Sequence, residues 1–312
     1  IWIIDDLGPI HQINKEIENS NFHIFSPIDS YKMGNRGWGG ESLNAGKNHH
    51  NGVEVFFNIN KNILNDSSNI SLEFLDKNKK LIKKYSNNDE KNPLKINGEK
   101  NSFVWNMRYD DAKGFDGLIM WAASLRGPKA SPGSYFVKLN VDENSMERSF
   151  NILKDPRSNS SIEDLKKQFD FLISVRDKVT IIHEAIIKIR STRKQLNELK
   201  EKLDENHNEL KENMNEVVNS ITKVEKMLYQ TKNRSGQDPL NFPIRLNNKL
   251  AHLASVASSG NYKPTDQMYS VRDELIKKID IELNLWNDIK KNKLEKINIA
   301  IKKSNIQLIS IN

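Results

Sequence analysis

The densest group of polar side chains that could bind a ligand lies in the C-terminal half, between two stretches rich in apolar residues. The segment YQTKNRSGQDPLNFPIRLNNKLAHLA runs from Tyr229 to Ala254. Amide, guanidinium and carboxylate groups offer donors and acceptors that can hold a polar ligand or the backbone of a partner. The candidate binding residues are Asn233, Arg234, Gln237, Asp238, Asn241 and Arg245.

The same residue types also predict a corner between two helices. Each helix end leaves four backbone groups without an intrahelical partner, and Asn, Ser and Asp side chains bond such groups locally. We expect Gly236 to adopt a positive φ angle, and Asn241 to cap the next helix with Pro243 near its first turn. Both arginines are expected to bind carbonyl groups or Asp238. A structural role is therefore favoured for the six residues, and recognition of a partner protein is the alternative.

Carboxylates that could catalyse hydrolysis occur here as adjacent pairs. Glycoside hydrolysis needs two carboxyl groups roughly 5 to 10 Å apart in a cleft. Asp5 and Asp6 would point in opposite directions from a strand, and Asp110 and Asp111 suit a turn. We predict no catalytic residue in this chain, so any active site would lie in sequence upstream of it.

Phosphate and metal sites are not predicted either. The glycine-rich segment GNRGWGG (34–40) lacks the lysine of a Walker loop, and we interpret it as a connector anchored by Trp38. The chain has 7 histidines and no cysteine, and His49 and His50 are adjacent without a metal-binding motif around them. His183 lies on an apolar helical face, where a buried and hydrogen-bonded histidine is expected. No metal and no cofactor are predicted.

Length, charge and hydrophobicity limit the class of protein. A chain of 312 residues is long enough for two domains. Its 48 basic and 41 acidic residues give a formal charge of +7, but the two signs are interleaved, whereas nucleic-acid binding needs a concentrated basic stripe. No apolar run approaches the roughly 18 residues that span a bilayer. We expect no nucleic-acid partner and no transmembrane segment.

Short runs of alternating apolar and polar residues between Gly52 and Leu153 predict strands. Turn residues separate the runs, and DENS after Val141 suits a hairpin turn. This pattern is typical of an antiparallel β-sandwich of immunoglobulin type without its disulfide. The seven predicted strands are Val53–Ile59, Ile70–Asp76, Leu81–Ser86, Ser102–Tyr109, Leu118–Ser124, Ser134–Val141 and Met146–Leu153.

Helical periodicity begins after DPRSNSS, at residues 155–161. Ser160 and Glu163 have the spacing of a capping box. Apolar residues then recur every three or four positions, each time on one side of a helix only. This predicts an antiparallel four-helix bundle with long helices. The four apolar faces run through 162–203, 210–228, 244–256 and, after Pro264, from 268 to 289 with a continuation to 301.

Three segments resemble one protein family. The first is IWIIDD, the second is FVWNMRYDDAKGFDG with GPKASPGSYFVKL, and the third is LYQTKNRSGQDPLNFPIRLNNKLAHLA with SSGNYKPTDQMY. They resemble the C-terminal part of large bacterial exported proteins with sortilin-like, BNR-repeat β-propellers, often labelled glycosyl hydrolases. The middle segment is also similar to the immunoglobulin-like domain of flagellar hook-capping proteins. The tail after Trp286, rich in lysine and isoleucine, departs from the family.

The resemblance implies an order of domains. Residues 1–10 would be the last strand of an upstream propeller, 11–51 an extended glycine-rich connector, 52–154 the immunoglobulin-like sandwich and 160–312 the helical bundle. Because the sequence starts inside an apolar strand, we expect it to be a fragment of a longer protein. The protein is expected to be exported, and to be periplasmic, outer-membrane-associated or extracellular.

These expectations favour a non-catalytic scaffold. The sandwich would brace the propeller, and the helices would present a surface to a protein partner or a membrane-associated complex. One alternative is a glycosidase or peptidase whose active site lies in the propeller, with these domains as accessories. Another is a sugar-binding sandwich, which would need exposed coplanar aromatic side chains on one sheet face.

Overall fold

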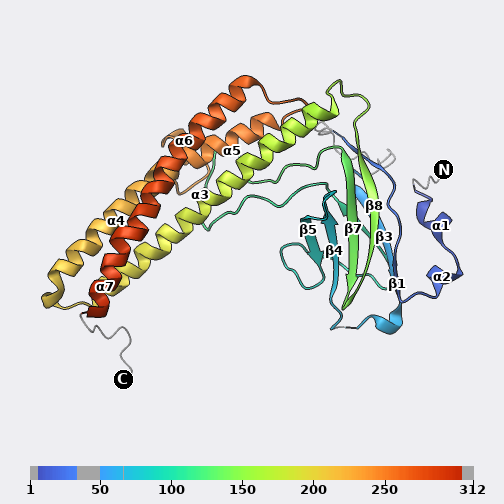
Figure 1. Ribbon diagram of the computed structural model, residues 1–312, viewed down its shortest axis with the longest axis horizontal. Coiled ribbons are helices and arrows are strands. Elements are labelled where there is room, and N and C mark those ends of the chain that lie inside the picture. Colours follow the sequence, from blue (N-terminus) through green and yellow to red (C-terminus); the bar gives the residue numbers. More distant parts are fainter. Residues whose placement is uncertain (1–5, 34–49, 66, 304–312) are drawn as a thin grey trace. The chain divides into compact units, whose positions relative to one another are not determined.

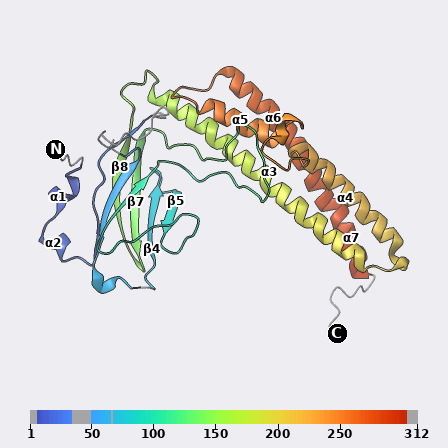
Figure 2. The same ribbon diagram turned by 180° about the vertical axis from the view of Figure 1, so that it is seen from behind.

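The computed structural model describes residues 6–33, 50–65 and 67–303, and it is a mixed α+β structure with antiparallel sheets and long helices (Figures 1 and 2). Contacts along the chain divide it into two units. The first comprises residues 1–110, 127–170 and 260–263, and the second comprises 111–126, 171–259 and 264–312. The strands therefore lie in the first unit, while residues 111–126 belong with the helices although strands precede and follow them in sequence.

Two sheets form the first unit. In the three-stranded sheet the order is β1 (Phe22–Ile24), β3 (Val53–Ile59) and β6 (Lys100–Trp105). In the five-stranded sheet the order is β2 (Ser30–Lys32), β8 (Asn144–Lys154), β7 (Gly133–Val141), β4 (Ile70–Leu75) and β5 (Leu81–Ser86). All neighbouring strands are antiparallel except β2 and β8, which are parallel.

One apolar core is shared by both sheets. Side chains alternate between the two faces of a strand, so the apolar positions of β3 all point inward: Val53, Val55, Phe57 and Ile59 are 0% exposed. Across the core, Trp105 of one sheet stacks on Phe74 of the other with ring centroids 4.5 Å apart. The alternation in the sequence therefore reports the buried face of each strand.

Of the seven strands predicted between Gly52 and Leu153, all but one are present in the structure. The run Leu118–Ser124 is not a strand, and it lies in the second unit with the helices. Its apolar side chains pack against helices instead of a sheet, an alternative that a short apolar run does not distinguish. The hairpin turn after Val141 is confirmed, and Asp142 adopts a φ of 49° there.

The range 11–51, expected as an extended connector, contributes strands to both sheets. Phe22 of β1 pairs with Ile59, and Ser30 of β2 pairs with Ile152. Two short helices precede them, α1 (Gly8–Gln12) and α2 (Lys15–Glu18), and a 3₁₀ turn η1 (Lys61–Ile63) follows β3. Strands of three residues carry too little periodicity to be recognised, and their partners are distant in sequence. Of the strand expected at 1–10, residues 1–5 lie outside the described residues, and residues 8–10 belong to the helix α1. The segment 34–40 with Trp38, and His49, also lie outside the described residues.

The helices are α3 (Ile162–Lys202), α4 (Asn208–Leu228), α5 (Leu246–Ala257), α6 (Asp266–Asp288) and α7 (Glu295–Lys303). Between them lie the 3₁₀ turns η2 (Glu205–His207) and η3 (Asp238–Leu240) and a π-helical segment η4 (Ile289–Leu294) that joins α6 to α7. Most residues of the predicted apolar faces form the core of the second unit, whereas Ile162, Val256 and Val271 are exposed. The capping box at the start of α3 is one residue later than expected: Ser161 Oγ accepts from Asp164 N at 3.0 Å, and the Asp164 carboxylate accepts from Ser161 N at 3.1 Å.

The helices do not lie side by side as four separate columns, which is the arrangement expected of a four-helix bundle. Arg190 of α3 pairs with Glu225 of α4, whereas Lys200 reaches back to Asn215, so α4 runs antiparallel to α3. The N-terminal end of α5 meets α3 at His183, about two to three turns before the α4 contacts at Arg190 and Arg193. In Figures 1 and 2, α4 and α5 follow one another along α3, and α6 with α7 runs beside both. Two helices thus occupy successive stretches of one side of α3.

Candidate functional site

Hydrogen bonds among the predicted site residues stabilise the loop between α4 and α5. The Asp238 carboxylate accepts from Arg234 N at 2.5 Å, from Ser235 N at 2.9 Å and from Ser235 Oγ at 3.1 Å. These bonds, led by the Arg234 backbone N–H, lower the pKa of Asp238. The Arg234 guanidinium donates to the carbonyl groups of Thr231 and Asn233, both at 3.0 Å. Polar groups that could have held a ligand are thus engaged within the loop.

The other four candidates show no binding constellation. Gln237 and Asn241 flank η3 and are exposed. Asn233 is buried at 6% exposure, and in the part of the chain that the structure describes neither its Oδ1 nor Arg245 Nε has a hydrogen-bond partner. The expected cap was wrong: Arg245 holds the N-cap position of α5 without a side-chain bond. Asn241 instead ends η3, where its backbone N–H donates to Asp238 O.

The expected conformation of Gly236 was also wrong. Among the described glycines, the φ angle is positive at Gly98, Gly117 and Gly133. The turn at Gly236 is closed instead by the side chain of Asp238, which bonds the residues on the N-terminal side of the glycine. A left-handed residue is therefore not needed there.

Residues 111–126, hereafter the 111–126 segment, are held against α3, α4 and α5. Ala112 is buried, and the apolar side chains of the segment pack against the helical core: Phe115, Leu118, Met120, Ala123 and Leu125. Its backbone bends at Gly117, whose φ of 74° suits glycine. The segment has no regular secondary structure, so its backbone groups need partners from the helices.

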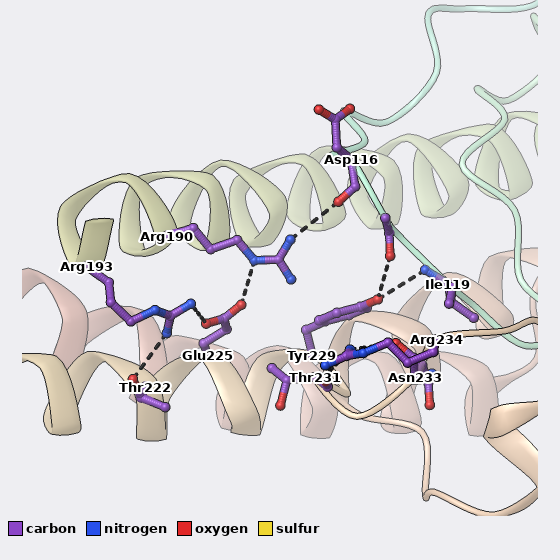
Figure 3. A network of polar contacts seen from close by, with 11 residues as sticks. Asp116, Ile119, Arg190, Arg193, Thr222, Glu225, Tyr229, Thr231, Asn233 and Arg234 are labelled. Atoms are coloured by element: carbon purple, nitrogen blue, oxygen red, sulfur yellow. Dashed lines mark hydrogen bonds and ion pairs between the residues drawn. The ribbon is translucent and has the colours of Figure 1, made fainter. Parts of the chain in front are cut away.

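A buried carboxylate between two arginines lies beside this segment (Figure 3). Glu225 of α4 is 1% exposed. It accepts from Arg190 Nε at 2.6 Å and pairs with Arg193 at 2.7 Å, and Arg193 also donates to Thr222 Oγ1 at 3.1 Å. The Arg190 guanidinium lies 4.6 Å from the centre of the Phe115 ring, which comes from the 111–126 segment. The charge of Glu225 is thus balanced inside the unit.

Tyr229, at the end of α4, bonds the backbone of the 111–126 segment twice (Figure 3). Its hydroxyl donates to Gly117 O and accepts from Ile119 N, both at 3.1 Å. Its ring meets Phe115 edge-on, with centroids 5.1 Å apart. Tyr229 is the first residue of the conspicuous sequence segment, and its structural role is to hold a distant part of the chain.

His183 has the buried, bonded environment that the sequence predicted. It is 0% exposed, its Nδ1 lies 2.5 Å from Lys113 O, and its Nε2 lies 3.1 Å from Asn247 Nδ2. Nδ1 therefore donates and Nε2 accepts, which is the neutral form. Burial lowers the pKa of His183, and the bond to Lys113 O partly opposes this shift.

Two further residues of α5 bind the same segment. Asn248 accepts from Trp121 N at 2.7 Å and donates to Trp121 O at 2.8 Å. The His252 ring nitrogen Nδ1 lies 2.6 Å from Ala122 O. Polar side chains of three helices thus satisfy the backbone of one irregular segment. This arrangement anchors structure and offers no free nucleophile or acid–base pair.

A groove lies on another side of the second unit, between α4 and the end of α6. Its hollow has a volume of about 480 Å³. Val224 and Ile289 are buried at its floor, while Met227 and Leu285 at its rim are 46% and 47% exposed. A smaller hollow of about 320 Å³ follows along α4 toward α7, and Lys293 borders both. The hollow between α4 and the end of α6 is hereafter the α4/α6 groove.

The carboxylates considered for catalysis form local contacts. Asp6 accepts from Gly8 N at 2.6 Å, and Asp110 forms an ion pair with Lys83 at 3.6 Å. Within residues 6–33, 50–65 and 67–303, no group of three His, Asp or Glu side chains could hold a metal ion. Over the same ranges no helix has the length and hydrophobicity to cross a membrane.

Sequence reasoning missed Arg190, Arg193 and Glu225 as a unit. The signal was present, because Glu225 directly follows the apolar face position Val224 and precedes Leu228 by three residues, which places a charge near the buried side of α4. It also did not predict that the 111–126 segment packs against the helices and that helix side chains bond its backbone.

Comparison with known proteins found no matching family model, no matching curated protein and no matching solved structure.

Proposed function

We propose that this chain is a non-catalytic interaction and scaffold region of an exported sortilin-like propeller protein. In this proposal the two sheets are an immunoglobulin-type sandwich that braces the propeller. The helices form a bundle in which α4 and α5 lie one after the other along the same side of α3. They present a surface to a partner protein. The family and the export rest on the resemblance of three sequence segments.

The α4/α6 groove is the observation that carries the interaction role. Half-exposed Met227 and Leu285 stand over a buried apolar floor at Val224 and Ile289. An apolar concavity of this kind on a charged helical surface is typical of a site that another molecule covers. The polar clusters of the same unit are bound to the chain's own backbone, so the groove is the better candidate for contact with a partner.

Photo-crosslinking in the cells that make the protein tests this function. A photoreactive amino acid is placed at Met227 in the groove, at Ile181 on α3 and at Leu81 on β5, which are 46%, 48% and 51% exposed. We expect a reproducible adduct with one protein from at least one position. The absence of adducts from all three, or hydrolysis of glycosidic or peptide substrates by the purified chain, would overturn the proposal.

The propeller part of the proposal has a separate test. Sequencing the gene upstream of the codon for Ile1 is expected to reveal repeated four-stranded blades. An upstream region without such repeats would remove the propeller and the export from the proposal and would leave the interaction role standing.

A further inference from the structure

We propose that the first unit binds the phosphate group of a small ligand at a cluster of four cations, Lys32, Arg108, Lys129 and Lys154. All four belong to the first unit, and the cluster lies where the parallel strands β2 and β8 end. The inference is independent of the proposed interaction function, which concerns the helices.

The four cations occupy directly opposite positions in two pairs. Lys32, the last residue of β2, is in register with Lys154, the last residue of β8. Arg108 is opposite Lys129 in an antiparallel bridge. Like charges directly opposite one another destabilise paired strands. An anion held by both pairs would offset this repulsion.

The two pairs meet beside Met33, the residue that follows Lys32. Lys129 Nζ donates to Met33 O at 3.4 Å, and Lys154 Nζ donates to Ser158 O at 2.7 Å, so both ammonium groups bind neutral carbonyls. Burial, and next the charges of Lys129 and Arg108, lower the pKa of Lys32 to about 8. The cations are therefore close enough to repel one another.

Lys32 has the least solvent of the four. Along β2, Ser30 and Lys32 are buried while Tyr31 between them is exposed, so the Lys32 side chain lies on the inward face of the strand. Lys32 is 6% exposed, whereas a lysine is almost never this buried unless it is paired. Across residues 6–33, 50–65 and 67–303, no carboxylate or carbonyl binds its ammonium group. Its charge thus lacks the partner that burial requires.

The carboxylates nearest to the cluster along the chain are engaged by other side chains. The pairs are Asp29 with Asn151 at 3.1 Å, Asp110 with Lys83 at 3.6 Å and Asp155 with Arg157 at 2.8 Å. None of the three lysines of the cluster forms an ion pair with a carboxylate of the described residues. The positive charge of the cluster therefore favours an anion from outside.

A phosphate group matches this arrangement better than a carboxylate does. It carries about −1.5 to −2 charges at neutral pH and at least three strong acceptor oxygens, so it can bind several cations from separate strands at once. A carboxylate supplies a single charge and two oxygens. The low exposure of Lys32 limits the ligand to free phosphate or a small phosphate ester.

Thermal unfolding of the whole chain in inorganic phosphate tests the inference. The titration is made at neutral pH and constant ionic strength, with sodium chloride as the balancing salt, so that screening is the same throughout. A ligand that binds only the folded protein raises the midpoint of unfolding. We expect a saturable rise with half-saturation below about 1 mM.

Three variants locate the site. Lys32→Met keeps an apolar side chain but removes the buried charge, so it should abolish the phosphate effect and leave the midpoint in chloride equal or higher. Lys129→Met should weaken binding at least about tenfold. Lys84→Met is the matched control, because it removes one exposed lysine of the same sheet, which pairs with Glu73 at 3.5 Å. Its phosphate binding should equal that of the wild type.

The same titration with glycerol 3-phosphate distinguishes the two sources of the phosphate group. Tighter binding of inorganic phosphate identifies the free ion, and tighter binding of glycerol 3-phosphate identifies an ester; both results support the inference. Half-saturation above about 10 mM would indicate an adventitious ion only and would overturn it. Unchanged binding in Lys32→Met, or an equal loss in Lys84→Met, would also overturn it.

A carboxylate of the chain itself is the other way to neutralise the cluster. Glu41 is the one acidic residue between positions 34 and 49, and it lies outside the described residues. Glu41→Gln tests this alternative. Phosphate binding to Glu41→Gln but not to the wild type would show that the protein supplies its own anion, which would overturn the inference. Equal binding by both proteins is the expected result.

Discussion

Two sides of the helical unit contrast in how their grooves are occupied. On one side the 111–126 segment lies against α3, α4 and α5, where Tyr229, Asn248 and His183 bond its backbone. On the other side the α4/α6 groove has an apolar floor at Val224 and Ile289, and charged side chains of both signs also line it: Glu282, Asp288, Lys223 and Lys293. The first side combines apolar packing with polar bonds and is filled by the chain itself. The second has an apolar floor and half-exposed Met227 and Leu285.

The contrast teaches where polar residues stabilise this protein. An irregular segment needs side-chain partners for its backbone, so the helices that hold it carry buried polar residues. A helical partner satisfies its own backbone, so a groove that receives one needs apolar floor residues and charges at the rim. The two compositions therefore predict different kinds of occupant.

The largest stability effect is expected at Glu225. Glu225→Ala leaves Arg190 and Arg193 without their carboxylate in a largely buried setting, and we expect a loss of about 3 kcal/mol in the free energy of unfolding. Glu282→Ala is the matched change in the open groove, and it should leave stability equal or higher, because it removes a poorly solvated charge that has no partner. Urea unfolding followed by helical circular dichroism measures both. Equal losses in the two variants would contradict the comparison.

A smaller effect is expected at Tyr229. Tyr229→Phe removes the bonds to Gly117 O and Ile119 N but keeps the ring against Phe115. Loss of these bonds should cost about 1.5 kcal/mol, and hydrogen exchange at 111–126 should accelerate. Tyr262→Phe, on a tyrosine outside this contact, is the control. Unchanged hydrogen exchange in the segment would show that its apolar side chains alone hold it in place.

Much of the fold follows from periodicity in the sequence. The inward face of β3 and the apolar faces of the helices are visible as steps of two and of three or four residues. Direction and register are less visible, because they depend on distant contacts. For example, β1 and β2 are three residues long, and their pairing with Ile59 and Ile152 has no local signal. The succession of α4 and α5 along α3 likewise depends on which residues of α3 each of them meets.

The structural role of the corner was predictable from the sequence, whereas its cap and the contacts of the 111–126 segment were not. The corner residues Arg234 and Asp238 bond the loop as the structural interpretation expected. The sequence of 118–124 predicts a strand, because a short apolar run has the same pattern whether a sheet or a helical groove buries it. The groove itself combines residues of α4, α6 and η4, and nothing in the sequence brings these three together.

A pH-dependent effect is expected at His183, on the filled side. Its pKa is lowered in the folded protein because burial disfavours the charged ring. Below about pH 6.5 the unfolded chain takes up the proton first, so stability falls as the pH decreases. His183→Gln should remove up to about 1.4 kcal/mol per pH unit of this slope. The measurement is urea unfolding between about pH 7.5 and 5.5.

The difference between wild type and variant is the quantity that matters there. His23 also has a lowered pKa, owing first to burial, and it is present in both proteins. His252→Gln is a matched control, because His252 is exposed although it bonds the same segment. Parallel curves for wild type and His183→Gln would show that the ring is not held neutral by its surroundings.

The smallest effect on stability, and the largest on binding, is expected in the open groove. Leu285 is 47% exposed, so Leu285→Asp removes little buried surface, and we expect a change within about 0.5 kcal/mol. Val271→Asp, on the same helix at similar exposure, controls for the introduced charge. Thermal unfolding should give similar midpoints for both, while only Leu285→Asp should lose the crosslink formed from Met227. If Leu285→Asp unfolded the helices as Glu225→Ala does, the groove would be part of the core, and the two sides would not differ in kind.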